Sequence, residues 1–497
     1  MKLGQLVRGA PGERVGVDLV AREITSLAYD SRRVKPGSLF FAIRGEKADG
    51  YDFVEQALER GAVAVASERP APPQLAGRCW VRVPHARRAL AEAARVFYGD
   101  PAARLQLVGI TGTNGKTTTT FLLHSILEAA GMRPGLFGTI EYRVGDRTLP
   151  AVHTTPESVD LLSYFADLIA VDGKAAIMEV SSHALAQERV WGIHFLAAVF
   201  TNLTRDHLDY HKDFESYFAA KRRLFEGVGA PPPELAVLNL DDPWSERLLE
   251  LPLKRYVTYG VESDAHVKVT NCTQSLTGVR ATLTTPQGKL EIESPLIGRT
   301  NLENILAAVA TAEALGIPGE AVRQGVGDLK SVPGRFERVS EGQPFLVVVD
   351  YAHTDDALRN ALTTARELTR NRLIVVFGCG GDRDRAKRPL MGEVAGSLSD
   401  LAVLTSDNPR TEDPIRIMND ALVGLQRANK PYLTEADRRA AIGKALAEAV
   451  DGDVVLIAGK GHETYQVLKN EIIPFDDREV ARQLLHAMGR TEKKEDT

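Results

Sequence analysis

Long apolar runs that end in polar residues recur through the middle of the chain. Residues 105–110, 175–180, 196–203 and 235–240 are such runs, and the first leads into a glycine-rich turn. Runs of this kind are typical of parallel strands buried on both faces. Ligands of open α/β sheets gather at the carboxyl ends of the strands, so the polar residues there are candidate site residues. Residues 256–298 are richer in Thr and Val and predict antiparallel strands instead.

Two further parts of the chain flank this region. Beyond residue 335, four more buried runs with helical stretches between them predict a second, Rossmann-like doubly wound sheet. Residues 1–103 contain shorter strands and a helical pattern from Ala86 to Phe97. Gly and Pro at 99–104 and 328–335 predict hinges. We therefore expect the α/β fold class with three domains: a small α/β domain at 1–103, a central domain with a mainly parallel sheet at 104–334, and a doubly wound domain at 335–497.

Composition narrows the class of protein. The net charge of −5, from 61 basic and 66 acidic residues, gives no electrostatic footprint for nucleic acid. The three cysteines lie too far apart for a metal knuckle or a disulfide framework. No apolar segment has the length of a signal peptide core or of the roughly 20 residues that span a membrane. We expect a cytoplasmic, monomeric protein that works on small molecules, without nucleic acid partners and without membrane insertion.

A glycine-rich loop follows the first buried run. In "GITGTNGKTTTT", Gly112 and Gly115 permit turn geometries in which amide groups face phosphate oxygens, and the following helix adds its positive dipole end. Lys116 is placed to reach the β- and γ-phosphates, and Thr117 to bind Mg²⁺. The spacing departs from the usual phosphate-loop pattern, because Ile110 stands where the first glycine belongs. The alternative is a glycine-rich turn without a ligand, but the GKT triplet and its context favour nucleoside triphosphate binding.

Polar residues at two other strand ends are candidate metal ligands. Glu179 ends one run and could complete a Mg²⁺ shell directly or through water. His207 follows another run, although a single histidine there is more often a packing or capping residue. Lys221 lies in the middle of a predicted helix, where a solvated surface lysine is the ordinary interpretation. From the residues alone, the roles of His207 and Lys221 stay open.

The segment "SDNPR" presents a carboxylate, an amide and a guanidinium at the end of a buried run. Asp407, Asn408 and Arg410, on a backbone stiffened by Pro409, could hold the two charges of a zwitterion. Taken by itself, the tetrapeptide favours a different interpretation, a proline-stiffened turn that carries surface charge.

Eight motifs in a fixed order resemble those of the Mur ligases of peptidoglycan synthesis. They are GTNGKTT, EVSSH, TNLTRDHLDYH, the helix carrying Lys221, DYAHT, GCGGDRDRAKRP, DNPR and GKGHETYQ. The resemblance covers nearly the whole chain, and it is closest to the members that add the third amino acid of the peptide. It implies an ATP-dependent ligase that joins meso-2,6-diaminopimelate to the D-Glu γ-carboxylate of UDP-MurNAc-L-Ala-D-Glu through an acyl phosphate.

The resemblance also implies a role for individual residues. The N-terminal domain would bind the UDP end, and the central phosphate-loop domain would bind ATP. ATP would contact Gly112, Thr113, Asn114, Gly115, Lys116, Thr117 and Thr118, with Asn301, Arg335, Asp350 and His353 lining the site from beyond the sheet. The UDP-MurNAc-dipeptide would contact Ser31, Thr154, Thr155, Ser181, Gln187 and Arg189. Diaminopimelate would contact Arg383, Asp407, Asn408, Pro409, Arg410, Gly459 and Glu463.

For catalysis, the resemblance implies Lys116, Glu179, His207 and Lys221. Thr117 and Glu179 would hold one Mg²⁺, and His207 would lie beside a second one. Lys221 would carry a CO₂-derived carbamate, which ligands or orients that second ion. Two positions depart from the family pattern or vary within it. Asp355 replaces a usual proline after DYAHT, and His153 precedes the Thr pair with no role assigned.

Rival interpretations remain on the sequence alone. Another ligase of the superfamily, including folylpolyglutamate synthase, is disfavoured by the DSR segment at 30–32 and by DNPR. A nucleotide-dependent switch or transporter subunit would need a partner surface or a transporter signature, and neither is recognisable. A dinucleotide-binding domain at 335–497 is disfavoured because no GxGxxG follows a strand there.

Overall fold

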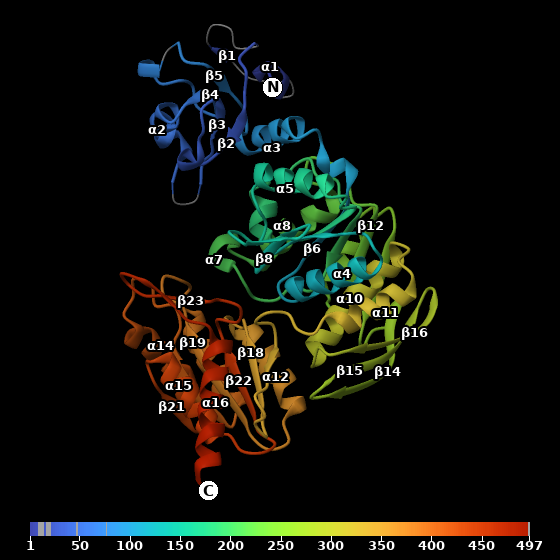
Figure 1. Cartoon of the computed structure of the whole chain (residues 1–497), viewed down its shortest axis with the longest axis vertical. Helices are drawn as coiled ribbons and strands as arrows, with labels where there is room; N and C mark the ends of the chain where they lie inside the picture. The colour runs from blue at the N-terminus through green and yellow to red at the C-terminus, as the bar shows by residue number, and fades with distance from the viewer. Residues whose placement is uncertain (8–13, 16–20, 46–47, 76, 496–497) are drawn as a thin grey trace.

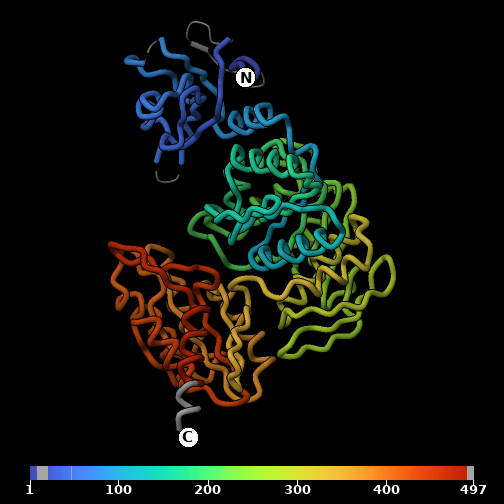
Figure 2. The backbone as a smooth tube through the Cα atoms, viewed as in Figure 1, coloured from blue at the N-terminus to red at the C-terminus, as the bar shows by residue number. Residues whose placement is uncertain are grey.

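Three β-sheets lie one after another along the molecule (Figure 1), and the two ends of the chain lie at opposite ends of it. The computed structural model describes residues 1–7, 14–15, 21–45, 48–75 and 77–495. The chain passes through the three sheets in sequence order, and the smooth tube of Figure 2 shows a single thin crossing on each side of the central sheet. The fold is therefore a row of three units, and the chain crosses once from each unit to the next.

The first sheet has five strands in the order β1-β5-β4-β3-β2, and only the β1–β5 pair is antiparallel. Phe40 and Phe41 lie on opposite faces of β3, and each is fully buried in a different core cluster. The elements are α1 (Leu3–Leu6), β1 (Arg14–Val15), β2 (Ser26–Ala28), β3 (Ser38–Ala42), α2 (Val54–Glu59), β4 (Ala62–Ser67), β5 (Trp80–Arg82) and α3 (Ala86–Phe97), with 3₁₀ turns at Ser31–Arg33, Gly50–Phe53, Pro73–Leu75 and Pro101–Arg104.

The central sheet has eleven strands in the order β16-β15-β14-β13-β12-β11-β6-β10-β7-β8-β9. The strands are β6 (Gln106–Thr111), β7 (Gly135–Phe137), β8 (Glu141–Val144), β9 (Arg147–Pro150), β10 (Ala175–Glu179), β11 (Ala197–Phe200), β12 (Leu235–Asn239), β13 (Tyr256–Gly260), β14 (Val267–Ser275), β15 (Gly278–Thr285) and β16 (Gly288–Ser294). Strands β7 and β10 to β14, with β6, pair in parallel, so their carboxyl ends share one edge.

Helices cover both faces of the central sheet. Leu107 and Val108 of β6 point into different core clusters, which explains why the strand is apolar from Leu107 to Ile110. The helices are α4 (Lys116–Ala129), α5 (Ser158–Ala170), α6 (Ser182–Ala186), α7 (Leu208–His211), α8 (Phe214–Glu226), α9 (Trp244–Leu249), α10 (Arg299–Ala314) and α11 (Gly319–Asp328). Helix α10 is Ala-rich because it is enclosed by α4, α11 and the sheet.

The third sheet has six strands in the order β17-β18-β22-β19-β20-β21, all parallel except the β17–β18 pair. The elements are β17 (Glu337–Val339), β18 (Leu346–Asp350), α12 (Asp355–Leu368), β19 (Leu373–Cys379), α13 (Lys387–Leu398), β20 (Leu401–Ser406), α14 (Pro414–Arg427), β21 (Tyr432–Thr434), α15 (Arg438–Glu448), β22 (Val454–Ala458), β23 (Tyr465–Val467), β24 (Ile472–Pro474) and α16 (Asp477–Glu495). Strands β23 and β24 form a separate hairpin. The predicted doubly wound sheet is therefore confirmed, with one antiparallel edge strand.

The prediction for residues 256–298 is correct for β14, β15 and β16, which pair antiparallel. It is wrong for β13, which runs parallel to both β12 and β14. The misjudged segment, "YVTYG", is short and half-exposed at its start, so its residue pattern does not separate the two kinds of strand.

The second predicted hinge makes an unusually close backbone contact with the end of the chain's last buried strand. Gly334 and Gly461 both have positive φ, at 63° and 53°. A Cβ atom on Gly334 would lie 2.0 Å from the backbone nitrogen of His462, and one on Gly461 would lie 2.7 Å from the carbonyl oxygen of Gly334. Only glycine satisfies both the dihedral angles and the approach distance.

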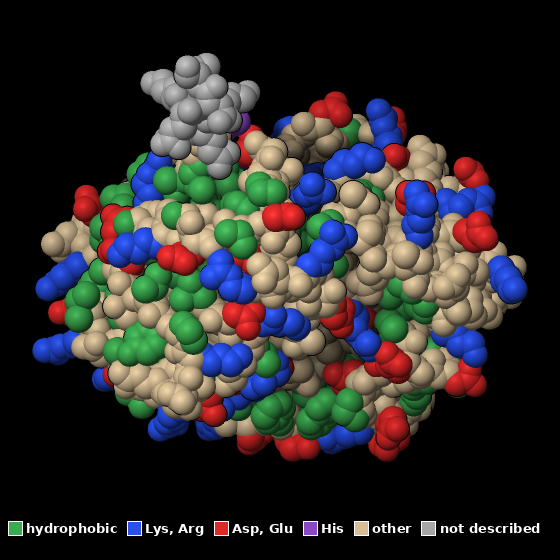
Figure 3. Space-filling view, turned by 90° about the horizontal axis from the view of Figure 1, so that it is seen from below, with side chains coloured by type: hydrophobic (Ala, Val, Ile, Leu, Met, Phe, Trp, Pro, Cys, Tyr) green, Lys and Arg blue, Asp and Glu red, His purple; other side chains and the backbone are tan. Residues whose placement is uncertain are grey.

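The surface carries mixed charge. Basic and acidic side chains alternate with hydrophobic ones across the face shown in Figure 3. Within the described ranges of the chain, no helix is both long enough and apolar enough to cross a bilayer.

Candidate active site

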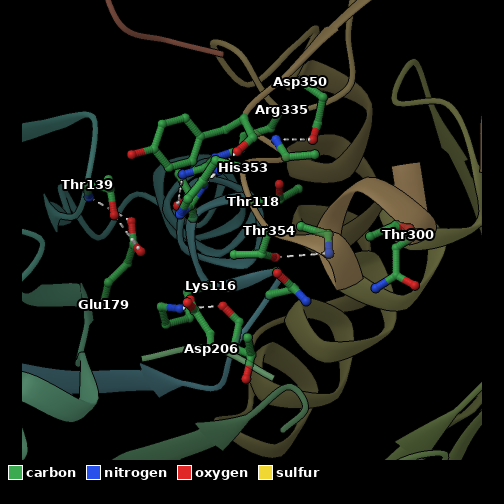
Figure 4. Close-up of a pocket in the computed structure, with 18 of the residues that line it drawn as sticks. Lys116, Thr118, Thr139, Glu179, Asp206, Thr300, Arg335, Asp350, His353 and Thr354 are labelled. Carbon is green, nitrogen blue, oxygen red and sulfur yellow. Dashed lines mark hydrogen bonds between the residues drawn. The ribbon is translucent and has the colours of Figure 1, made fainter. Parts of the chain in front are cut away.

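A cavity of about 270 Å³ opens between the central and third sheets, where the predicted ATP residues meet. Figure 4 shows Thr139 and Glu179 on one side of it and Arg335 and Asp350 on another, with Lys116 between. Of the predicted ATP residues and metal ligands, those lining the cavity are Thr113, Asn114, Gly115, Lys116, Thr117, Thr118, Glu179, His207, Lys221, Asn301, Arg335, Asp350 and His353. Gly112 is outside this lining.

The glycine-rich loop joins β6 to α4 in a conformation that requires its glycines. Gly112 has φ 149° and Gly115 has φ 84°. A Cβ atom on Gly112 would lie 1.8 Å from the Thr201 hydroxyl, and one on Gly115 would lie 2.4 Å from Asn304 Oδ1. The loop is therefore pressed against β11 and α10, which fixes the start of α4 at the cavity.

Two of the loop amides are already engaged by the protein. The Thr113 amide donates to the Asn202 carbonyl at 2.9 Å, and the Asn114 amide donates to Asn202 Oδ1 at 2.8 Å. The amides of the first turn of α4 have no partner within the helix and remain for an anion. The amides of Thr113 and Asn114 are therefore excluded from the phosphate-facing set that the sequence predicts.

Two buried lysines converge on the loop carbonyls. Lys116 Nζ donates to the carbonyls of Gly112 and Thr113 at 2.9 and 2.8 Å, and Lys221 Nζ donates to the same Gly112 carbonyl at 2.6 Å. Burial lowers the pKa of Lys116. Burial and then the charge of Lys116 lower the pKa of Lys221 well below its usual value. Lys221 is 1% exposed, so the surface-lysine interpretation is wrong.

Glu179 is buried at the end of β10 and is held by one residue. Its Oε1 accepts from the Thr139 amide at 2.8 Å, and its Oε2 accepts from the Thr139 hydroxyl at 3.0 Å. The same hydroxyl lies 3.2 Å from the Thr154 hydroxyl. Thr139 thereby links the candidate metal ligand to a predicted substrate contact, and sequence reasoning missed it.

Asp206 and His207, after β11, face the third sheet. Asp206 Oδ1 accepts from Lys387 Nζ of α13 at 3.0 Å, and Asp206 Oδ2 lies 3.3 Å from His207 Nε2. Burial raises the pKa of Asp206, but His207 and Lys387 outweigh it and hold the pKa well below its usual range. Burial lowers the pKa of His207 to about 3 despite Asp206. The Lys387–Asp206 pair joins the two units across the cavity.

Residues beyond the hinge close the cavity from the other side. Arg335 Nη2 donates to the Thr117 hydroxyl at 3.2 Å, and its guanidinium lies over the Tyr351 ring. Asp350 accepts from the backbone amides of Phe336 and Ala352, so both of its oxygens are engaged and it holds the hinge in place. Burial raises the pKa of Asp350, with Arg335 opposing.

The side chains of this cavity suit a magnesium ion whose coordination is completed by phosphate oxygens. Among the described residues, no cluster of three or more His, Cys, Asp or Glu side chains could hold a metal. The oxygen donors that line the cavity include the Thr117 hydroxyl and the carboxylates of Glu179 and Asp206. Mg²⁺ is commonly bound through one or two protein oxygens with substrate phosphates and waters completing its octahedron, so this donor set is suitable.

A second, larger cavity of about 1090 Å³ runs from the first sheet to the third. Its lining includes the predicted contacts Ser31, Thr154, Ser181, Gln187, Arg189 and Arg383, and also His153. Thr155 is different, because it is 0% exposed and its hydroxyl donates to the Glu179 carbonyl. Its side chain supports the wall and does not face the cavity. Thr154, Ser181 and His207 line both cavities, so the two meet there.

The predicted amino-acid residues form a third cluster, in loops at the carboxyl ends of β20 and β22. Asp407, Asn408 and Glu463 approach one another through hydrogen bonds, and a Cβ atom on Gly459 would lie 2.7 Å from Asp407 Oδ2. Asp407 Oδ2 is buried without a hydrogen-bond partner among the described residues. Pro409 also packs here, since a Cβ atom on Gly381 would lie 1.9 Å from its carbonyl oxygen.

The two predicted arginines lie beside this cluster. Arg410 has φ 53°, and its Nη1 donates to the Gly381 carbonyl at 2.8 Å, which leaves Nε and Nη2 for a ligand. A Cβ atom on Gly380 would lie 3.0 Å from Arg410 Nη1 and 3.8 Å from Arg383 Cγ. Arg383 therefore lies between the second cavity and the amino-acid cluster.

Comparison with known proteins places these features in one family. Three family models match the chain: "Mur ligase family, catalytic domain" at residues 23–98, "Mur ligase middle domain" at 110–312, and "Mur ligase, glutamate ligase domain" at 334–461. A UDP-N-acetylmuramoyl-L-alanyl-D-glutamate–2,6-diaminopimelate ligase of Solibacter usitatus is 57% identical over 98% of this chain and 99% of its own length. The chain belongs to the Mur ligase family. The predicted fold class and the predicted enzyme class, an ATP-dependent ligase, are thereby confirmed.

Other relatives of this Mur ligase agree. A ligase of the same name from Geobacillus thermodenitrificans is 47% identical over 97% of this chain and 99% of its own length. The solved structure of another ligase of that name is 35% identical, with a TM-score of 0.69 over 98% of this chain and all of that one. The MurF ligase of Thermotoga maritima in complex with ADP shares the fold, at 21% identity and a TM-score of 0.59 over 97% of this chain and all of that one.

Sequence reasoning missed several residues that shape the site of this Mur ligase. Thr139, Asn202 and Asp206 organise the metal and phosphate region, and Lys387 crosses the cavity. Asn202, Asp206 and Lys387 lie inside recognised motifs, so their neighbours gave a usable signal. Thr139 follows a short strand with no motif around it, and only the fold brings it to Glu179.

Proposed function

We propose that this Mur ligase adds meso-2,6-diaminopimelate to the D-Glu γ-carboxylate of UDP-MurNAc-L-Ala-D-Glu, with cleavage of ATP to ADP and phosphate. The observation that carries the proposal is the meeting of the two cavities at Thr154, Ser181 and His207. A nucleotide in the smaller cavity and an elongated substrate in the larger one would bring their reacting ends together at that junction. The names of the relatives, which are 2,6-diaminopimelate ligases, support the same substrates.

The first step joins two anions, and the buried lysines make their approach tolerable. A γ-carboxylate oxygen attacks the γ-phosphorus of ATP, the bond to ADP breaks, and an acyl phosphate forms. Lys116, at the start of α4, is placed to turn from the loop carbonyls toward the transferring phosphoryl group. Arg335, which contacts Thr117 from the other side of the cavity, would also bind the nucleotide.

Mg²⁺ and a carbamate on Lys221 complete the proposed site. Thr117 and Glu179 would hold one Mg²⁺, which supplies charge neutralisation at the phosphates. Burial lowers the pKa of Lys221, which favours the unprotonated amine, the form that adds CO₂ with loss of a proton. The resulting carbamate would lie beside His207 and provide an oxygen ligand for a second ion.

In the second step, the amine nitrogen of the amino acid attacks the acyl carbon, loses a proton, and phosphate leaves. Arg410 would pair with the far carboxylate of diaminopimelate through Nε and Nη2, and Glu463 would accept from the adjacent ammonium. Arg383, between the cluster and the second cavity, would contact a carboxylate near the reacting end. L-Lysine has no far carboxylate, so it would leave Arg410 unpaired.

The three ligands would each be received by a different domain, with boundaries at 1–103, 104–334 and 335–497. We further propose that the enzyme works as a monomer on small molecules alone. Because its nucleotide substrates are cytoplasmic compounds, we place the enzyme in the cytoplasm.

The decisive test is phosphate release from ATP with UDP-MurNAc-L-Ala-D-Glu, in the presence of meso-diaminopimelate, L-lysine or no amino acid. We expect turnover with meso-diaminopimelate only. Turnover with lysine would retain the ligase but reject the role of Arg410. Equal hydrolysis in all three reactions would reject ligation and support a nucleotide-dependent switch.

A further inference from the structure

Lys460, which follows β22, is a charged residue at the centre of the amino-acid cluster that has been given no role. Its side chain is 0% exposed. Its ammonium donates to Asn408 Oδ1 at 3.1 Å and to Glu463 Oε2 at 2.9 Å, and it lies 5.8 Å from the centre of the Tyr465 ring. A fully buried ammonium is tolerated because these partners replace its hydration.

The contacts of Lys460 determine which way the Asn408 amide points. Asn408 Oδ1 accepts from Lys460 and also from the Val467 amide at 2.9 Å. Both partners can only donate, so an oxygen must occupy that position. The Asn408 Nδ2 group then donates to Glu463 Oε2 at 2.8 Å. One N–H of the Asn408 side-chain amide can therefore still donate to a substrate, whereas its oxygen already accepts two hydrogen bonds.

Lys460 and Asn408 likewise engage only one of the two carboxylate oxygens of Glu463. Its Oε2 accepts from both Lys460 and Asn408, whereas no hydrogen bond from the described residues reaches its Oε1. The side chain is 16% exposed, so it retains access to solvent or a ligand. The carboxylate therefore presents a single oxygen, in a fixed orientation, while its charge is balanced from behind by an ammonium.

We propose that Lys460 is a positioning and specificity-determining residue. It matches the pocket to an amino-acid substrate whose far end is zwitterionic. This inference rests on the proposed function. Around the far end, Lys460 and Arg410 carry positive charge, and Glu463 and Asp407 carry negative charge, so these four charges balance. Arg383 lies outside this set because it faces the second cavity, and the charge of Arg438 is balanced by Asp477. A far end with one ammonium and one carboxylate fits that balance. Without Lys460, the pocket has a net negative charge that favours the purely cationic end of L-lysine.

Steady-state kinetics of Lys460→Met test this proposal, with Lys430→Met as a matched control. Lys430 donates only to the carbonyls of Ser397 and Ser399, away from the cluster. For Lys460→Met we expect kcat/KM for meso-diaminopimelate to fall about 100-fold, mainly through KM, on the scale of removing one partner of a buried charge pair. The preference for meso-diaminopimelate over L-lysine falls at least about tenfold, and KM for ATP stays within about twofold of wild type. The control is unchanged.

Two results would overturn the proposal. One is an equal loss for ATP and for both amino acids, which indicates general damage to the fold. The other is a wild-type ratio of diaminopimelate to lysine activity in a folded Lys460→Met variant. A wild-type enzyme that ignores meso-diaminopimelate would instead reject the proposed function, so the two failures are distinguishable.

A second variant keeps the test valid if Lys460→Met folds poorly. Glu463→Gln with Lys460→Met removes the ammonium together with the carboxylate that needs it. If Lys460 acts through Glu463, the double variant loses no more than about threefold in kcat/KM for meso-diaminopimelate beyond Glu463→Gln alone. Losses that multiply would show that Lys460 acts elsewhere and overturn the proposal.

Discussion

The phosphate cavity and the amino-acid cluster treat buried charge in opposite ways. At the phosphate loop, Lys116 and Lys221 donate to backbone carbonyls, and neither forms an ion pair with a carboxylate of the described residues. In the amino-acid cluster and behind it, the two fully buried cations have carboxylate partners in place, Lys460 with Glu463 and Arg438 with Asp477.

The difference corresponds to the ligand that each site is proposed to receive. Unpaired buried cations are costly, and burial lowers the pKa of both loop lysines accordingly. A triphosphate brings several negative charges, which offset that cost on binding. A zwitterion brings no net charge, so a pocket for it must be balanced beforehand. The balance of charge among the side chains of a site thus indicates the net charge of its ligand.

The largest effect is expected from removing Lys221. Lys221→Ala should lower kcat by on the order of 10³-fold, because the proposed carbamate is lost and with it a preorganised oxygen ligand for the second ion. Added formate or acetate should restore part of the activity by replacing the carbamate oxygens. The exposed Lys174→Ala is the control. Near-normal turnover of Lys221→Ala, or no rescue by any short carboxylate, would contradict the carbamate role.

A smaller and more selective effect is expected on the amino-acid side. Arg410→Ala should raise KM for meso-diaminopimelate about 100-fold, since its far carboxylate loses a charged partner. KM for ATP should change by less than about twofold. Initial rates over a matrix of both substrates measure the two constants, and the exposed Arg427→Ala serves as a control. Similar increases for both substrates would remove Arg410 from the amino-acid pocket.

Removing the Lys387–Asp206 contact between the central and third domains should have a still smaller effect that does not distinguish the substrates. Lys387→Met removes the ion pair with Asp206 and should lower kcat about tenfold, the scale of a partly buried pair. Small-angle scattering should show less contraction with ligands than in wild type, because closure loses a contact between domains. Arg385→Met is the control, since Arg385 pairs with Asp420 of its own domain. Unchanged kcat and contraction would show that the pair plays no part in closure.

The smallest effect concerns charges that are paired for stability alone. The hydrogen bond from Arg388 lowers the pKa of Glu412 to about 2. A lowered carboxyl pKa stabilises the fold above the unfolded-state value near 4.5, and this contribution is lost as the pH falls toward 2. Glu412→Gln should therefore lower Tm by about 2 °C at pH 7, and the difference from wild type should disappear between pH 4.5 and 2. A difference independent of pH would point to packing instead.

Most of the fold was predictable because its signals are local. Buried runs marked the parallel strands, and "GTNGKTT" marked the loop before α4. Asp355 illustrates a local departure that proved harmless to helix formation. It occupies the first position of α12, where proline is common and where an acidic side chain also interacts favourably with the helix dipole.

The part that could not be predicted depends on contacts between distant segments. No sequence pattern indicates that Asn202 engages two loop amides, that the Thr155 hydroxyl faces inward, or that Lys387 meets Asp206. The burial of Lys221 was likewise invisible, because a single lysine in an amphipathic helix has no feature that separates a buried side chain from an exposed one. Family resemblance supplied the expected role of Lys221, and the structure added its burial.

The close contact of Gly334 with Gly461 has a consequence for how the chain can evolve. A side chain on Gly334 collides with the backbone of Gly461 and His462, and one on Gly461 collides with the Gly334 carbonyl and also with Tyr351. A substitution of Gly334 separates the two segments and so removes part of the clash that a substitution of Gly461 would meet. The two mutations should therefore show positive epistasis, with the double mutant less damaged than the sum of the single effects. Selection on two codons far apart in the gene would then be coupled, although neither glycine takes part in the proposed reaction.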